Sequence, residues 1–186
     1  MFKKVKNWNY FKRIYIGIKL IFIKYILAAI YRLLYVSYHD VLIHIMRKKC
    51  DIDKTARIGR EVKISGNVKI GANTYINGGL ISTGPNSKVI IGEWCAIGYN
   101  VNIIASSHDI EKPTGPIHER PIIEGDIIIG NNVWIGSNAF IRHGVTVGNK
   151  SIIGANSVVV KDISDNTIVG GIPAKLIRYK NAHISN

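Results

Sequence analysis

Cysteine is scarce in this sequence, with Cys50 and Cys95 as its only two residues. Two cysteines cannot build the disulfide framework of a small secreted domain, and this pair stands at no spacing typical of a metal site. A cleavable signal peptide is not expected either, because lysine and arginine interrupt the apolar N-terminal stretch and no small-residue cleavage site follows. These absences favour a folded protein of the reducing cytoplasm, without a metal cofactor.

Acidic residues are almost missing from the first fifty residues, where Asp40 stands against eleven lysines and arginines, a net charge of +10. Ten of the sixteen aromatic residues lie in the same segment. Residues 51–186 carry fourteen basic residues against eleven acids, which leaves a net charge of only +3. The composition therefore divides the chain into a basic, aromatic arm (residues 1–50) and a nearly neutral body, with a tail at residues 179–186.

The arm is predicted to contain a helix over residues 10–38. Its lysines and arginines leave no uncharged run near the ~20 residues of a transmembrane helix. Tryptophan and tyrosine beside basic residues are typical of a helix in the membrane interface, so we expect peripheral contact with the inner face of the membrane. The alternatives are packing in an oligomer, docking of a protein partner, or a nucleic-acid-binding arm. The last is disfavoured, because the segment is mostly Ile, Leu and Tyr.

The body repeats with a period of six residues, which is the signature of a solenoid. Fourteen positions six apart, in three series, are all Ile or Val, and eight of them are followed directly by glycine. The fourth residue after the aliphatic position is usually small or β-branched. The fourteen positions are Ile52, Ile58, Ile64, Ile70 and Ile76; Ile91, Ile97 and Ile103; and Ile129, Ile135, Ile141, Val147, Ile153 and Val159.

A six-residue period has a specific physical meaning. Each short strand presents one aliphatic side chain inward, and a corner containing Gly or Asn then turns the chain, because both residues tolerate positive φ. Three such strands close a triangular coil, and successive coils stack at about 4.8 Å. One coil cannot bury its own apolar face, so the stability comes from stacking.

Four blocks within the repeat carry a family resemblance: Ile129–Gly136 (IGNNVWIG), Gly144–Gly148 (GVTVG), Ile153–Val159 (IGANSVV) and Val169–Lys175 (VGGIPAK). Over residues 52–178 the chain resembles the left-handed parallel β-helix acyltransferases with hexapeptide repeats. Within them it is similar to the maltose/galactoside acetyltransferase branch and its polysaccharide-modifying relatives. The resemblance implies an all-β, left-handed parallel β-helix, here with an N-terminal helical arm, and it implies acetyl-CoA as acyl donor.

The repeat is interrupted twice. The gap of fifteen residues between Ile76 and Ile91 requires a bulge or loop, expected at residues 82–87. The chain then leaves the coils for an excursion over about residues 106–122, with His108 at its root. Acyl transfer to a hydroxyl needs a base of near-neutral pKa, and the family's general-base histidine lies at this place, so His108 is predicted to be the base. His118, within the excursion, could help to bind the acceptor.

The resemblance also implies the other site residues. Asn77 matches an asparagine that orients the acceptor or stabilises the intermediate, and Trp134 matches a tryptophan beside the pantetheine channel. Cofactor contacts are implied for Ser137, Ala155, Lys161 and Arg178, with the last two at phosphates. The family's cofactor groove lies between neighbouring subunits, so a homotrimer is implied too.

These predictions favour an acetyl-CoA-dependent O-acetyltransferase acting on a sugar hydroxyl of a surface polysaccharide or its lipid-linked precursor. One alternative is a soluble acetyltransferase for small sugars or xenobiotics, or a sugar N-acetyltransferase. A remote alternative is a metal lyase of the γ-carbonic-anhydrase type. That chemistry needs three histidines at a subunit interface, and the body has no close pair of histidines at the usual spacing.

Overall fold

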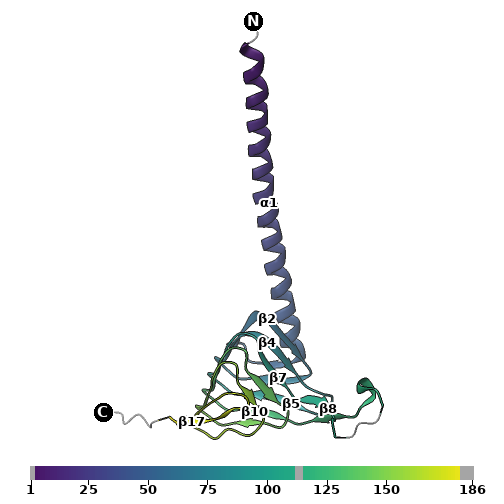
Figure 1. Ribbon diagram of the computed structural model, residues 1–186, viewed down its shortest axis with the longest axis vertical. Helices are drawn as coiled ribbons and strands as arrows, with labels where there is room; N and C mark the ends of the chain where they lie inside the picture. The colour runs from purple at the N-terminus through teal and green to yellow at the C-terminus, as the bar shows by residue number, and fades with distance from the viewer. Residues whose placement is uncertain (1–2, 112–114, 181–186) are drawn as a thin grey trace, which may run out of the picture. The chain divides into compact units, whose positions relative to one another are not determined.

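The computed structural model describes residues 3–111 and 115–180 (Figure 1). The chain divides into two compact units, Met1–His44 and Ile45–Asn186. Each unit is described by itself. Residues 181–186 of the predicted tail and residues 112–114 of the predicted excursion lie outside the described residues.

The first unit consists of helix α1 (Lys3–Lys49), which extends beyond the predicted residues 10–38 at both ends and continues into the second unit. Its apolar side chains point in every direction, since the consecutive residues Leu20–Ile23 are all exposed and successive helical residues are turned by about 100°. Within the described part of the chain, Tyr15–Lys49 is the one helix long and apolar enough to cross a membrane by length and composition. The predicted interfacial contact stays a prediction.

The end of α1 is tied to the first coil of the second unit. The Arg47 guanidinium donates hydrogen bonds to the carbonyl oxygens of Asp53 (3.0 Å) and Ala56 (2.7 Å), and Met46 packs against the edge of the core. Basic residues fill the last turn, where they interact favourably with the helix dipole. The second unit therefore begins at the last turn of the helix rather than at its first strand.

The second unit is a triangular β-helix whose strands stack in parallel on three sides (Figure 1). The strands β2 and β4 bend around the corner between the second and third sides, so β4 pairs with β6 on one side and with β7 on the other. The first side contains β1 (Asp51–Ile52), β3 (Asn67–Ile70), β5 (Lys88–Ile91), β10 (Ile127–Ile129) and β13 (Thr146–Val147). The corner strands are β2 (Arg57–Ser65) and β4 (Tyr75–Ser82). The second side continues with β6 (Ala96–Ile97), β11 (Trp134–Ile135), β14 (Ile152–Ile153) and β16 (Thr167–Gly170). The third side continues with β7 (Val101–Ile104), β12 (Phe140–Arg142) and β15 (Val158–Val159).

This architecture confirms the predicted fold class, a left-handed parallel β-helix with an N-terminal helix. The antiparallel strand β17 (Lys175–Tyr179) pairs with β16 at the end of the second side. The predicted excursion contains β8 (Ser106–His108), the short 3-10 helix η1 (Ile117–Glu119) and β9 (Ile122–Glu124), with β8 and β9 antiparallel.

The hexad residues form the core, as the period predicts. Twelve of the fourteen aliphatic positions are buried, and Ile58 and Ile64 in the first coil are partly buried against it. Each stacks on its counterpart one coil away, as Ile97 does on Ile135. The series missed Ile81, which occupies the third side beside Ile103, because it follows Ile76 by five positions in place of the regular six.

Asparagine and glycine both adopt positive φ at turns, as the sequence predicts, and a second set of glycines has another role. Of the thirteen positive φ angles among the described residues, six belong to asparagines, such as Asn132 (φ 56°) and Asn156 (φ 58°), and five belong to glycines. The glycine that follows the aliphatic residue is needed for close approach instead: a Cβ on Gly136 would lie 2.5 Å from the backbone nitrogen of Ala155 in the next coil. Coils therefore stack closely at the glycines that follow the aliphatic residues, and they turn at asparagines and at other glycines.

Candidate functional site

A row of outward-facing side chains runs along the second side of the prism. Because alternate residues of a strand face opposite ways, the residue before each buried isoleucine points outward. In register these residues are Tyr75, Ala96, Trp134 and Ile152. The aromatic residues Tyr75 and Trp134 stand two strand spacings apart, about 10 Å, with only the methyl group of Ala96 between them. The two rings and the alanine form a slot open to solvent.

The slot belongs to a groove of about 470 Å³ on the second side and its corner with the third. Four predicted site residues line this groove together: Asn77, Trp134, Ser137 and Ala155. Glycines at three successive coils also line it, so no side chain rises from those positions. An extended, thin ligand could therefore approach the backbone along the axis of the helix.

Hydrogen bonds between coils hold the corner that borders the groove. The Ser137 hydroxyl accepts a hydrogen bond from the backbone N–H of Tyr99 (3.1 Å), so this side chain joins two coils as well as lining the groove. The amides of Asn100, Asn138 and Asn156 form a ladder, each donating to the next at 3.0 and 3.1 Å. Side-chain hydrogen bonds therefore join successive coils along the groove wall.

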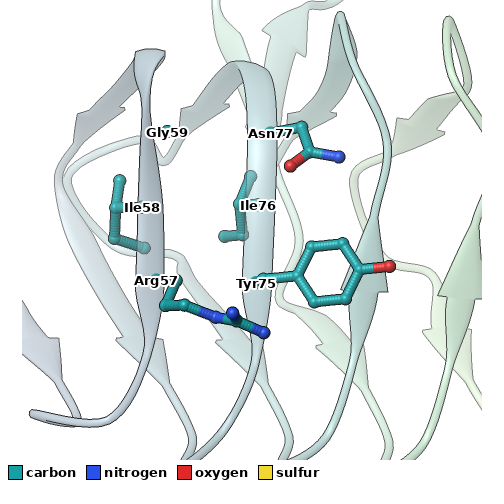
Figure 2. Close-up of a pocket in the computed structure, with 6 residues that line it drawn as sticks. All are labelled: Arg57, Ile58, Gly59, Tyr75, Ile76 and Asn77. Carbon is teal, nitrogen blue, oxygen red and sulfur yellow. The ribbon is translucent and has the colours of Figure 1, made fainter.

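A second hollow, of about 360 Å³, continues from the groove toward the first coil (Figure 2). It shares Tyr75 and Asn77 with the groove, and its other lining residues are Arg57, Ile58, Gly59 and Ile76. The guanidinium carbon of Arg57 lies 5.7 Å from the centroid of the Tyr75 ring, a cation–π distance. Asn77 thus stands at the junction of two connected hollows.

The predicted phosphate contacts, Lys161 and Arg178, do not line the groove. Arg178 lies on β17 and pairs with Ile168 of β16, which pairs with Ile152 of the groove. It therefore continues the strand order of the groove toward the C-terminal end of the prism. Lys161 follows β15 at the same end, and both side chains are exposed.

His108 stands elsewhere. It ends β8, the strand that leaves the prism at the corner between the third and first sides. The groove occupies the second side, opposite that corner, so one chain does not bring His108 together with Asn77 or Trp134. Its Nδ1 atom is buried and has no hydrogen-bond partner among the described residues. Buried polar atoms without a partner are rare in proteins and call for a functional or structural explanation.

Two other histidines lie near the excursion. His118 on η1 is exposed, with its Nε2 atom 3.7 Å from Glu119. His143 accepts a hydrogen bond from the Arg142 side chain (3.2 Å), and burial together with that positive charge lowers the pKa of His143. Among the described residues no three His, Cys, Asp or Glu side chains group as metal ligands.

Sequence reasoning missed Arg57, Tyr75 and Ala96. The sequence did carry a signal for Tyr75 and Ala96, because each directly precedes a buried isoleucine of the second side, as Trp134 does. The hexad pattern does not indicate which outward-facing residues bind a ligand. The shared position of these residues became apparent only when the strand register placed them in one row.

Comparison with known proteins gives consistent results. The model of the family described as bacterial transferase hexapeptide (six repeats) matches residues 126–161. Galactoside O-acetyltransferase of Escherichia coli (strain K12) is 39% identical over 118 residues, covering 62% of this chain and 55% of that protein. The putative lipopolysaccharide biosynthesis O-acetyl transferase WbbJ of the same strain is 35% identical over 95 residues, covering 51% and 46%. The chain therefore spans about half the length of these curated relatives.

The solved structure of a galactoside acetyltransferase in complex with coenzyme A superposes with a TM-score of 0.63. Its sequence is 31% identical to this chain, and the match covers 74% of this chain and 69% of that one.

Proposed function

Since the chain belongs to the hexapeptide-repeat acyltransferase family, we propose that it transfers an acetyl group from acetyl-CoA to a sugar hydroxyl of a surface polysaccharide or its lipid-linked precursor. The observation that carries this proposal is the groove on the second side. It collects Asn77, Trp134, Ser137 and Ala155, which are separated by up to 78 residues of sequence, in one continuous surface.

The donor would lie along the axis of the prism. The row from Ala96 through Trp134, Ile152 and Ile168 to Arg178 spans four strand spacings, about 19 Å. This length suits an extended pantetheine arm. With its phosphates near Arg178 and Lys161, the thioester would reach the slot beside Ala96 and Asn77. Trp134 would then cover the arm from one side.

The base would come from another copy of the chain. Because His108 lies at the corner opposite the groove, the groove of one subunit can meet only the His108 of a neighbour. A homotrimer of prisms packed around a threefold axis supplies such neighbours, and it accounts for a groove that collects four predicted site residues but lacks a base. The buried Nδ1 leaves Nε2 as the atom that faces the acceptor.

The chemistry then follows from the residue types. Nε2 of His108 accepts the proton of the acceptor hydroxyl while its oxygen attacks the thioester carbonyl. The tetrahedral intermediate carries negative charge on the former carbonyl oxygen, which the Asn77 amide stabilises by donating a hydrogen bond. The intermediate collapses to the acetyl ester, and the thiolate of CoA leaves and takes the proton back from His108.

The arm is proposed to hold the enzyme at the cytoplasmic face of the membrane, where lipid-linked glycans are available. Six basic residues stand in residues 1–19, and Arg47, Lys48 and Lys49 stand at the other end of α1. Since basic flanks stay on the cytoplasmic side, basic residues at both ends favour an arm that inserts from one face without crossing. Similarity to a lipopolysaccharide-modifying relative supports the same class of acceptor.

The experiment is a transfer assay with labelled acetyl-CoA and a panel of nucleotide sugars, lipid-linked glycans and cell-envelope extracts. Label on a glycan, released by mild alkali as an ester, is the expected result. Label that resists alkali would indicate an amide and hence an N-acetyltransferase. Label confined to small neutral sugars or xenobiotics would contradict the polysaccharide role, and absence of transfer together with absence of acetyl-CoA binding would contradict the activity itself.

A further inference from the structure

The excess positive charge of the second unit is concentrated at one end. Residues 45–70, which form the last turn of α1, the first coil and the strand β3 stacked on it, carry eight basic residues against three acids, a net charge of +5. Residues 71–186 carry nine against eight, a net charge of +1. The end of the prism next to Asn77 is therefore basic, and the remainder is almost neutral.

One of these charges, that of Arg57, lies in the lining of the hollow that Asn77 also lines. Arg57 is the only charged residue of its lining, and no carboxylate lines it. None of the ion pairs found in the described part of the chain involves Arg57. The Tyr75 ring orients the guanidinium without neutralising it, at 5.7 Å (Figure 2). Three more exposed cations, Lys54, Arg60 and Lys63, lie on the same coil.

We propose that this hollow, lined by Arg57, Ile58, Gly59, Tyr75, Ile76 and Asn77 and named here the first-coil subsite, binds an anionic group of the acceptor. The inference rests on the proposed function and names its substrate class: a glycan with a carboxylate or phosphate near the hydroxyl that receives the acetyl group. Arginine suits this role because its planar guanidinium binds both oxygens of such groups at once.

The arrangement also fixes the direction of the acceptor. The donor groove runs from Asn77 toward the C-terminal end of the prism, and the first-coil subsite runs from Asn77 the opposite way. An acceptor anchored by its anion at Arg57 would present its hydroxyl at Asn77, next to the thioester. A neutral sugar would lack this anchor.

The test is calorimetric titration of the full chain saturated with CoA, using glucose, glucose 1-phosphate and glucuronate as probes. The two anions should bind more tightly than glucose, and Arg57→Gln should weaken both by about tenfold or more, the loss expected for a charged hydrogen bond. Lys150→Gln is the control, because this exposed lysine lies in another corner of the prism. If Arg57→Gln weakens the binding of only glucose 1-phosphate or only glucuronate, the affected probe identifies the anionic group that the subsite accepts.

Equal binding of glucose and the anions, or no effect of Arg57→Gln on the anions, would overturn the subsite. Arg57→Gln that weakens sedimentation with anionic vesicles and leaves sugar binding unchanged would overturn it as well, since Arg57 would then serve lipid. The labelled-acetyl assay separates the two proposals. Acetyl transfer to neutral glycans that Arg57→Gln does not affect would contradict the subsite alone. Anion binding that depends on Arg57, without any acetyl transfer, would contradict the proposed function alone.

Discussion

Replacement of Trp134 by alanine tests whether the groove binds the donor. The side chain is 56% exposed and faces outward between Ala96 and Ile152, so it contributes little to the core. A tryptophan offers about 200 Å² of surface, of which about 110 Å² is therefore open to a ligand. If the pantetheine arm covers half of that, about 25 cal/mol per Å² gives about 1.4 kcal/mol, or about a tenfold rise in the Kd for CoA.

The assay is titration calorimetry with CoA, alongside a thermal melt. Trp94→Asn is the matched control, since Trp94 is similarly exposed (60%) but stands at a corner with φ 58°, where Asn73, Asn132 and Asn166 stand in other coils. This control should leave the affinity for CoA unchanged and should not lower the melting temperature, because asparagine tolerates that φ better than tryptophan. Unchanged affinity in Trp134→Ala, or an equal loss in both variants, would refute the assignment of the groove.

Three further perturbations follow from the same geometry. Lys161→Ala and Arg178→Ala should each raise the KM for acetyl-CoA by about tenfold to a hundredfold, with a smaller effect on the KM for the acceptor. An unchanged KM for acetyl-CoA in both variants would contradict the proposed phosphate contacts. Gly136→Val should lower the free energy of unfolding by about 1–3 kcal/mol in a denaturant titration, because its Cβ would lie 2.5 Å from the backbone of the next coil. An unchanged free energy of unfolding would contradict the need for close approach at this position. Deletion of residues 1–44 should preserve the melting temperature of the prism and abolish sedimentation with anionic liposomes, and equal sedimentation of both forms would contradict the role of the arm.

The period of six residues was sufficient to predict the prism, because each aliphatic position fixes both a strand and the direction of its side chain. It could not place Ile81, since a corner one residue short shifts the count without any change in composition. Nor could it show which glycines serve close approach and which serve turns, because the need for close approach is visible only when the next coil is in place.

The site was predictable in part for a different reason. Asn77, Trp134, Ser137 and Ala155 came from the family resemblance, and the structure brings them into one groove. The position of His108 opposite that groove depends on which corner the excursion leaves, and no local pattern encodes that. The roles of these residues stay predictions, because outward positions of a hexad carry no sequence signature for chemistry.

Whether His108 is the base of an acetyl transfer is tested by the kcat of His108→Ala with acetyl-CoA and a glycan acceptor that carries a free hydroxyl. General-base assistance contributes about 10²–10⁴-fold, so kcat should fall at least about a hundredfold. His108 is only half buried and lies outside the stacked core, and it does not line the groove, so the melting temperature and the Kd for CoA should stay unchanged. A variant that folds, binds CoA and keeps near-normal kcat would contradict the account.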